Sequence, residues 1–288
     1  MRFLITGVGG QLGYDVKKEL LSRGYSKEDI LAPSRALLDI TNKVRVIECV
    51  YNFKPDVIFH CAAYTAVDKA EEEKELCYDV NVNGTKYLVE AAKKVEAKII
   101  YISTDYVFDG TKDGIYQVDD PYCPVNYYGE TKCLGEKLVK EYANHLIVRI
   151  SWVFGVHGNN FVKTMLKLAE TKKELGVVCD QTGSPTYTKD LSKVLVEMSL
   201  KDIRGIYHVT NEEYCSWYEF AKYIFEVNGI EMLVNPVLTQ DYKTVAKRPL
   251  NSRLDKSCLD EIGIERMPSW QNAVKRYSKV LKKESGKE

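Results

Sequence analysis

The chain has 288 residues, 45% of them hydrophobic, which suits a globular protein with one substantial core and a smaller appended lobe. Lysine plus arginine equals aspartate plus glutamate at 41 each, so no overall charge favours nucleic acid or an anionic membrane as a partner. The eight cysteines form no CxxC pair and the four histidines are scattered, so we expect no metal site. No apolar run approaches the ~18 residues of a membrane span, and we expect a soluble protein of the cytoplasm.

Short apolar runs alternate with longer amphipathic stretches in the first half of the chain, as in βαβ units. The pattern predicts strands at 2–6, 29–33, 57–62, 98–103 and 146–153, and helices at 10–22, 42–53, 71–95 and 127–142. Further on it predicts helices at 161–171, 189–199, 215–228 and 270–283, with strands at 175–178 and 206–210. The expected fold is α/β, a Rossmann-type doubly wound parallel sheet with a smaller C-terminal substrate-binding lobe. We place the sheet domain at 1–154, with elements near 175–210 returning to it, and the lobe mainly at 155–288.

Three glycines spaced three residues apart follow the first expected strand directly. Gly7 allows a tight strand-to-helix turn, Gly10 lets the backbone approach a pyrophosphate, and Gly13 lets the helix pack close to the strand. Gln11 and Leu12 begin that helix, where free N–H groups and a partial positive charge favour phosphates. Many tight turns contain glycines, but this one lies between a strand and an amphipathic helix. We therefore predict that domain 1–154 binds NAD or NADP.

The end of the second strand usually decides between the two cofactors, because an acidic residue there holds the ribose 2′-hydroxyl of NAD. The sequence has Arg35 at this point and no acid. Its guanidinium could accept a 2′-phosphate, which favours NADPH, or it could be a solvated loop arginine.

Tyr128 and Lys132 have the spacing YxxxK at the start of an expected helix, so their side chains share a helical face. An adjacent ammonium stabilises a phenolate and is expected to lower the tyrosine pKa by roughly 1–3 units. Thr104 lies at the carboxyl end of the fourth strand, where ligands bind in doubly wound sheets. Thr104 could be only a turn residue and Tyr128 only a packed aromatic, but together with the glycine turn they predict a catalytic set.

These residues resemble the extended short-chain dehydrogenase/reductase family, most closely its members that reduce the C4 keto group of a dTDP-linked sugar. The resemblance covers about the whole chain. The matching blocks are 38–41, 62–71, 103–108, 127–132, 149–153, 158–161, 180–186 and 248–253.

The resemblance implies a role for each matching residue. Cofactor contacts are implied for Gly7, Gly10, Gln11, Leu12, Gly13, Arg35, Asp39, Ile40, Ala62, Ala63, Tyr64, Tyr128 and Lys132. Within that set, Asp39 and Ile40 would lie against the adenine, and residues 62–64 would line the path to the nicotinamide ribose. Substrate contacts are implied for Thr104, Asp105, Trp152, Asn159, Arg248 and Arg253, of which the last two would hold the diphosphate. Cys61 and Tyr64 depart from the family, which commonly has a polar residue and often a histidine there.

The implied reaction is hydride transfer to C4 of a 4-keto sugar nucleotide, with Tyr128 donating the proton and Thr104 supporting the oxygen. One rival hypothesis is another enzyme of the family, such as a 4-epimerase or a GDP-fucose-type synthase. A second is a non-catalytic NADP-binding regulatory subunit, like that of methionine adenosyltransferase. The sequence does not fix the oligomeric state, and a homodimer is compatible with it.

Overall fold

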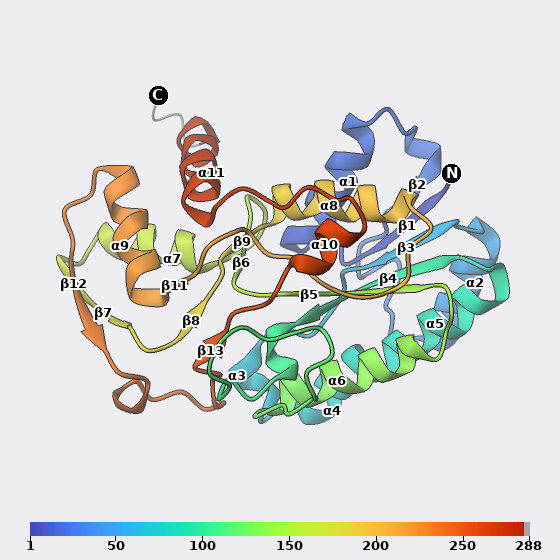
Figure 1. The fold of residues 1–288 in the computed structure, drawn as a ribbon. Coiled ribbons are helices and arrows are strands. Elements are labelled where there is room, and N and C mark those ends of the chain that lie inside the picture. The colour runs from blue at the N-terminus through green and yellow to red at the C-terminus, as the bar shows by residue number, and fades with distance from the viewer. Residues whose placement is uncertain (285–288) are drawn as a thin grey trace.

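The computed structural model describes residues 1–284, and a six-stranded sheet in the order β10-β5-β4-β3-β1-β2 forms its centre (Figure 1). All its strand pairs are parallel, and its side chains are mostly buried because helices cover both faces. The predicted doubly wound parallel sheet is thus confirmed. The strands are β1 (Phe3–Thr6), β2 (Ile30–Leu31), β3 (Val57–His60), β4 (Lys98–Thr104), β5 (His145–Ile150) and β10 (Gly205–His208).

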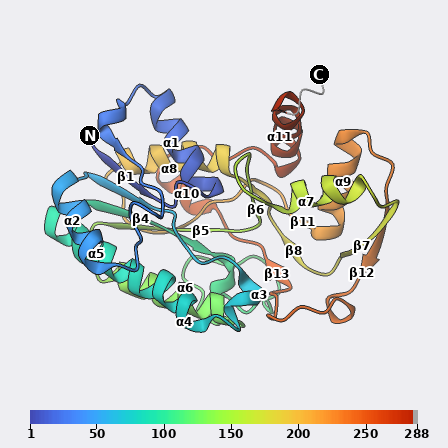
Figure 2. The same ribbon diagram turned by 180° about the vertical axis from the view of Figure 1, so that it is seen from behind.

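Two layers of helices enclose this sheet, as the front and back views show (Figures 1 and 2). One layer holds α1 (Gln11–Ser22) and α8 (Thr188–Leu200), which pack against each other. The other holds α2 (Lys43–Phe53), α5 (Gly84–Val95) and α6 (Tyr127–Lys140). Short 3₁₀ turns η1 (Lys27–Asp29) and η3 (Asp105–Val107) adjoin β2 and β4. Each layer covers its own apolar core on its face of the sheet.

The direction of winding reverses at β1, because β1 lies between β2 and β3 in the sheet. Ligands of such sheets bind outside the carboxyl ends of the strands at this reversal. The ends of β1 and β3 carry the residues predicted to hold a cofactor, and β4 ends next to them at Thr104. The topology therefore gathers the candidate site at one edge of the sheet.

Two predicted elements are broken in the structure. The helix expected at 71–95 is divided into α4 (Lys74–Tyr78), a π-helical turn η2 (Asp79–Asn83) and α5, and a short helix α3 (Val67–Ala70) precedes it. The strand expected at 146–153 ends at Ile150, since Trp152 has a positive φ of 49° that a strand cannot contain. Both breaks occur where side chains turn toward the candidate site.

The smaller lobe has its own hydrophobic core, into which α7, α9 and α11 bury their apolar faces (Figure 2). Of the elements expected near 175–210 to return to the large sheet, α8 and β10 lie there. β7 instead pairs with β12, because Leu175 and Val177 are buried in the core of the small lobe. The elements are β6 (Val153–Phe154), α7 (Phe161–Ala169), β7 (Glu174–Val178), β8 (Thr182–Gly183), β9 (Thr186–Tyr187), β11 (Cys215–Ser216), α9 (Trp217–Asn228), β12 (Leu233–Val237) and α11 (Trp270–Glu284).

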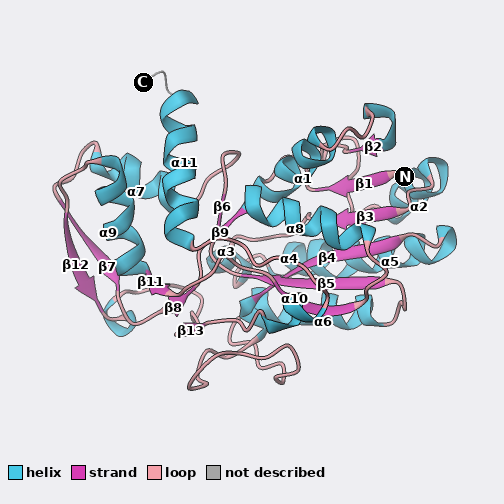
Figure 3. Cartoon of the chain, turned by 45° about the horizontal axis from the view of Figure 1, so that its top comes forward, coloured by secondary structure: helices cyan, strands magenta, loops and turns pink. Residues whose placement is uncertain are grey.

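A strap, which we define as residues 242–256, carries the chain from the small lobe back to the large one (Figure 3). It follows η4 (Thr239–Asp241), contains β13 (Asn251–Ser252), and precedes α10 (Ser257–Glu261). β13 pairs with β8, and Leu254 bridges to Tyr116. Gly110 has a φ of +75°, and a Cβ there would stand 2.5 Å from Pro249 Cβ. The strap therefore packs directly on the loop that follows β4.

Candidate active site

The glycine turn between β1 and α1 is tight at two positions. Gly7 has a φ of +73°, and a Cβ on it would stand 2.6 Å from the backbone nitrogen of Ala62. A Cβ on Gly13 would stand 2.5 Å from the carbonyl oxygen of Gly7. Gly10 is exposed at the N-cap of α1 and no side chain caps the helix. The free N–H groups of this turn can therefore receive a pyrophosphate.

Gln11 and Leu12 can contact a pyrophosphate mainly through their backbone N–H groups. The side chain of Leu12 is buried in the core, and Gln11 Oε1 accepts a hydrogen bond from Asn160 Nδ2 at 3.1 Å. Asn160 also caps α7, whereas Asn159, the residue implied to contact substrate, is exposed. The asparagine that reaches the glycine turn is thus the neighbour of the predicted one.

The side chains that follow β2 differ in their exposure and in the number of their hydrogen bonds. Arg35 is 75% exposed and lies 3.9 Å from Asp39 Oδ2. Asp39 Oδ1 accepts hydrogen bonds from the backbone and the hydroxyl of Thr41, which lower the pKa of its carboxyl. Ile40 is buried against Gly84. Arg35 is consequently free to turn toward a 2′-phosphate, while Asp39 is held by its own loop.

The loop after β3 is fixed through its backbone. Ala62 donates its N–H to Thr6 Oγ1 at 3.2 Å, and Thr6 in turn contacts the buried ring of His60 at 3.0 Å. Ala63 is half-buried beside them. Burial raises the pKa of the Cys61 thiol to about 12, so it stays protonated near neutral pH. The loop therefore presents small, uncharged surfaces toward the reversal point.

The backbone of Tyr64, and not its phenol, is hydrogen-bonded to Asn81. Asn81 Oδ1 accepts the Tyr64 N–H at 2.8 Å, and Asn81 Nδ2 donates to the Tyr64 carbonyl at 3.2 Å. The phenol donates to Glu73 Oε2 at 2.7 Å. Asn81 lies in the π-helical turn and was not predicted, because nothing in a helical pattern marks a contact with a distant loop.

Tyr128 and Lys132 are both buried on α6, which begins at an Asn126 cap. Lys132 Nζ donates to the Ile102 carbonyl at 2.7 Å and lies 4.0 Å from the centre of the Tyr101 ring. Burial lowers the pKa of Lys132 to about 7.

The expectation that Lys132 lowers the pKa of Tyr128 is wrong for the free protein. Burial, followed by the charge of Asp105, raises the pKa of the phenol. Lys132 does not oppose this rise, because its own pKa is lowered to about 7 and it is uncharged at the higher pH where the phenol titrates. Tyr128 is therefore a neutral phenol at neutral pH, which is the state that a proton donor requires.

Thr104 and Asp105 lie beside Tyr128 at the end of β4. Thr104 Oγ1 donates to Asp105 Oδ1 at 2.9 Å, and the neighbouring Thr104 side chain partly offsets the raised pKa of the Tyr128 phenol. Asp105 Oδ2 accepts the hydroxyl of Ser252, on the strap, at 2.5 Å. The strap is thus hydrogen-bonded to the predicted catalytic set.

Trp152, predicted to contact substrate, packs against the core of the small lobe. Its ring stacks on Trp217 with centroids 3.7 Å apart and an interplanar angle of 12°. A Cβ on Gly183 would stand 2.7 Å from the indole, so only glycine leaves room for it. The left-handed backbone turns this indole out of the sheet and into the lobe.

The two arginines of the strap have different surroundings. Arg248 Nη2 donates to Asp68 Oδ2 at 2.5 Å, and Asp68 Oδ1 also accepts the Ala246 N–H. The second terminal nitrogen of Arg248, Nη1, is buried without a hydrogen-bond acceptor. Arg253 donates to Asn251 and forms no salt bridge within residues 1–284. Both guanidiniums therefore retain donors for an anion.

This geometry can be compared with known proteins. Residues 1–283 match the model of the family described as the RmlD substrate binding domain. The chain belongs to the RmlD substrate binding domain family. It is 46% identical to the dTDP-4-dehydrorhamnose reductase of Aggregatibacter actinomycetemcomitans, over 95% of this chain and 97% of that protein.

Two solved structures of RmlD-like proteins are similar throughout. The dTDP-4-dehydrorhamnose reductase of Bacillus anthracis strain Ames, in complex with NADP, is 42% identical with a TM-score of 0.92, covering 96% of this chain and 98% of the other. The ortholog from Clostridium acetobutylicum is 41% identical with a TM-score of 0.94, covering 98% and 100%. The resemblance predicted from sequence blocks is confirmed.

In this RmlD-family chain, a buried ion pair lies next to the residues predicted to be catalytic. Arg149 donates to both oxygens of Glu136, at 2.9 Å each, and both side chains are almost fully inaccessible. Glu136 also accepts the hydroxyls of Ser103 at 2.5 Å and Tyr122 at 2.7 Å. Ser103 precedes Thr104 and Glu136 lies one turn after Lys132, so the pair joins β4 to α6. Glu136 was not predicted as a site residue.

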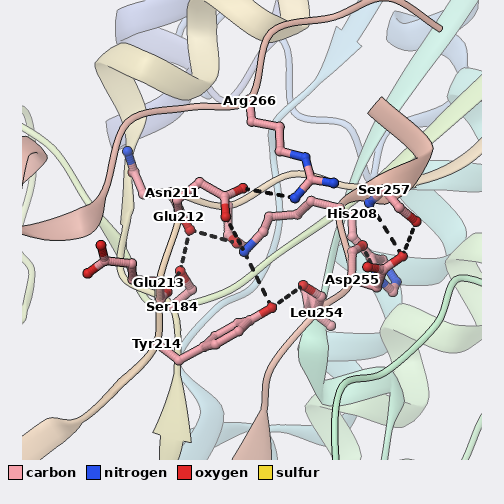
Figure 4. Close-up of polar contacts among 12 residues, drawn as sticks. Ser184, His208, Asn211, Glu212, Glu213, Tyr214, Leu254, Asp255, Ser257 and Arg266 are labelled. Carbon is pink, nitrogen blue, oxygen red and sulfur yellow. Dashed lines mark hydrogen bonds and ion pairs between the residues drawn. The ribbon is translucent and has the colours of Figure 1, made fainter. Parts of the chain in front are cut away.

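A second polar cluster holds the end of the strap, as Figure 4 shows. Glu212 faces Arg266 at 3.7 Å, and the Tyr214 hydroxyl donates to the Leu254 carbonyl at 3.0 Å. Lys256 is buried against Tyr214 and lies 3.7 Å from Glu212. These contacts fix the C-terminal end of the strap.

Within residues 1–284 no group of three or more His, Cys, Asp or Glu side chains is arranged to hold a metal ion. In the same part of the chain, no helix is both long and apolar enough to cross a membrane.

Proposed function

We propose that this chain reduces the C4 keto group of dTDP-4-dehydro-L-rhamnose with NADPH, giving dTDP-L-rhamnose. The proposal rests mainly on the relative named dTDP-4-dehydrorhamnose reductase, which is similar to this chain over nearly its full length. It is supported by Thr104, Tyr128 and Lys132, which lie at the end of β4 and on α6. A related structure in complex with NADP agrees with the cofactor.

The residues present fit a dinucleotide. Gly7 and Gly13 permit the tight turn between β1 and α1, because a Cβ on either would collide with neighbouring backbone, and the uncapped start of α1 offers N–H groups to the pyrophosphate. Exposed Arg35 can reach a 2′-phosphate, and the 62–64 loop borders the nicotinamide side. When bound, NADPH supplies the hydride.

Tyr128 is the proton donor in this proposal. Its phenol is neutral because burial raises its pKa, and a positioned general acid typically contributes ~10²–10⁴-fold to the rate. Lys132 holds the nicotinamide ribose, and its positive charge stabilises the phenolate that forms when the proton leaves. Thr104 donates a hydrogen bond to the oxygen that becomes negative.

The nucleotide end of the substrate falls to the smaller lobe and the strap. The stacked indoles of Trp152 and Trp217 offer a flat apolar wall for the sugar. The unpaired Nη1 of Arg248 and the Arg253 guanidinium are the donors for the diphosphate.

The test is NADPH oxidation with dTDP-4-dehydrorhamnose, alongside UDP- and GDP-linked 4-keto sugars, followed by identification of the product sugar. We expect turnover of the dTDP substrate far above that of the other two, and rhamnose as the product. Equal kcat/KM for all three would remove the substrate assignment, and an epimerised or dehydrated product would favour a different enzyme of the fold. No turnover at all would favour the regulatory-subunit hypothesis.

A further inference from the structure

Asp105 is a buried carboxyl that pairs with no cation of residues 1–284. Its side chain is 3% exposed, and both of its partners are hydroxyls. Thr104 Oγ1 donates to one oxygen at 2.9 Å, and Ser252 Oγ donates to the other at 2.5 Å. Thr104 and Ser252 are themselves 6% and 2% exposed, so both hydrogen bonds are buried.

The Thr104 hydroxyl has one hydrogen, and in the free protein that hydrogen goes to Asp105. Its oxygen meanwhile accepts the Tyr106 N–H at 3.3 Å. An ionised Asp105 can only accept, so it keeps the Thr104 hydrogen and leaves none for a substrate oxygen. A protonated Asp105 can donate to Thr104 Oγ1 with one oxygen while the other still accepts from Ser252. The positions of Thr104, Asp105 and Ser252 therefore suit both protonation states of Asp105. The two states differ in whether the Thr104 hydroxyl donates to Asp105 or accepts from it.

We propose that Asp105, held by Ser252, is a positioning residue that decides whether Thr104 can donate a hydrogen bond to the reacting keto oxygen. The neutral acid turns the Thr104 hydroxyl toward the substrate, and the carboxylate turns it away. The inference rests on the proposed function, in which Thr104 stabilises that oxygen. It also gives Ser252 a role, because the hydrogen bond from its hydroxyl stabilises the carboxylate form of Asp105 relative to the neutral acid.

The pKa of Asp105 lies close enough to neutral pH for both of its protonation states to be populated. Burial raises the pKa of Asp105 to about 6, against the lowering effects of the bonds from Ser252 and Thr104. The titratable groups facing it are Tyr128 on α6 and Tyr106 on its own turn, both phenols of raised pKa that stay neutral. On the strap, Arg248 contacts Tyr106 and is paired with Asp68. Lys132, farther along α6, titrates at about 7 and has to be separated from Asp105 by experiment.

The experiment measures single-turnover hydride transfer from pH 5 to 9 with dTDP-4-dehydrorhamnose. In the wild type we expect the rate to fall above pH 6, by up to the ~10²-fold that one oxyanion donor contributes. Asp105→Asn carries N–H groups at every pH, so this limb should disappear and only the Lys132 limb remain. Ser252→Ala loses a bond to the charged form, so its limb should move to higher pH by about one unit. Ser257→Ala is the matched control, because that exposed hydroxyl bonds only Asp255.

A second readout needs neither substrate nor cofactor. The side-chain ¹³C carboxyl signal of Asp105, assigned by its loss in Asp105→Asn, should titrate near pH 6 in the wild type and about one unit higher in Ser252→Ala. Two results would overturn the inference: an Asp105 that titrates below pH 4, or a pH dependence of the rate that does not move when the Asp105 titration moves. In either case, wild-type turnover would still support the proposed function. Absence of wild-type turnover would overturn both.

Discussion

Lys132→Met should make the protein more stable at neutral pH while abolishing most of its activity. Lys132 is buried, with only 2% of its surface exposed. Its pKa of about 7 lies far below the ordinary 10.5 because burial disfavours the charge. Methionine has a similar length and no charge, so it removes the cost of that burial without leaving a large cavity.

The magnitude follows from the pKa. The interval between 10.5 and about 7, at 1.36 kcal/mol per pKa unit, corresponds to about 5 kcal/mol of destabilisation at pH 7 and below. Against it stands the bond to the Ile102 carbonyl, whose loss leaves a buried acceptor and costs roughly 1–3 kcal/mol. The contact with the Tyr101 ring contributes about 1 kcal/mol more. The net gain in unfolding free energy is therefore about 1–3 kcal/mol.

The gain has a characteristic pH dependence. The folded protein releases the Lys132 proton at a lower pH than the unfolded chain does. The destabilisation is therefore complete below pH 7 and fades as the pH rises toward 10.5. Urea unfolding of the cofactor-free protein at pH 6.5 and 9.5 measures it, with exposed Lys137→Met on the same helix as the control. A loss of stability at pH 6.5, or a gain that grows with pH, would refute the reasoning.

Four further variants test the proposed proton donor and the arginines proposed to bind ligands. Tyr128→Phe should lower kcat by ~10²–10⁴-fold and leave the Kd for NADPH nearly unchanged, as measured by fluorescence titration; near-normal turnover would exclude Tyr128 as the donor. Arg35→Ala should raise the KM for NADPH but not for NADH, and an equal response would make Arg35 a bystander. Arg253→Ala should weaken dTDP binding by roughly 1.5–3 kcal/mol in calorimetry. Arg248→Ala should do the same and also free Asp68; unchanged affinity in both variants would remove the strap from the diphosphate site.

The fold and the glycine turn were predictable because they depend on local patterns. Apolar runs of strand length and a glycine at every third position report on neighbours within a few residues. The partners of the site residues were not predictable in this way. Ser252 meets Asp105 across 147 residues, and Asn81 meets Thr131 across 50. Such contacts depend on how the strap and the π-helical turn fold back, which no periodicity encodes.

The pKa of Tyr128 shows where spacing alone is misleading. A separation of four residues on a helix places Lys132 on the same face as Tyr128, and that much is correct. The sign of the effect depends on what else surrounds the two groups. In the free protein burial lowers the pKa of Lys132 to about 7, so the lysine carries no charge where the phenol titrates, while burial of the phenol and the neighbouring Asp105 carboxyl raise the pKa of Tyr128. A reductase benefits from this arrangement, because its tyrosine has to hold its proton until a negative oxygen develops beside it.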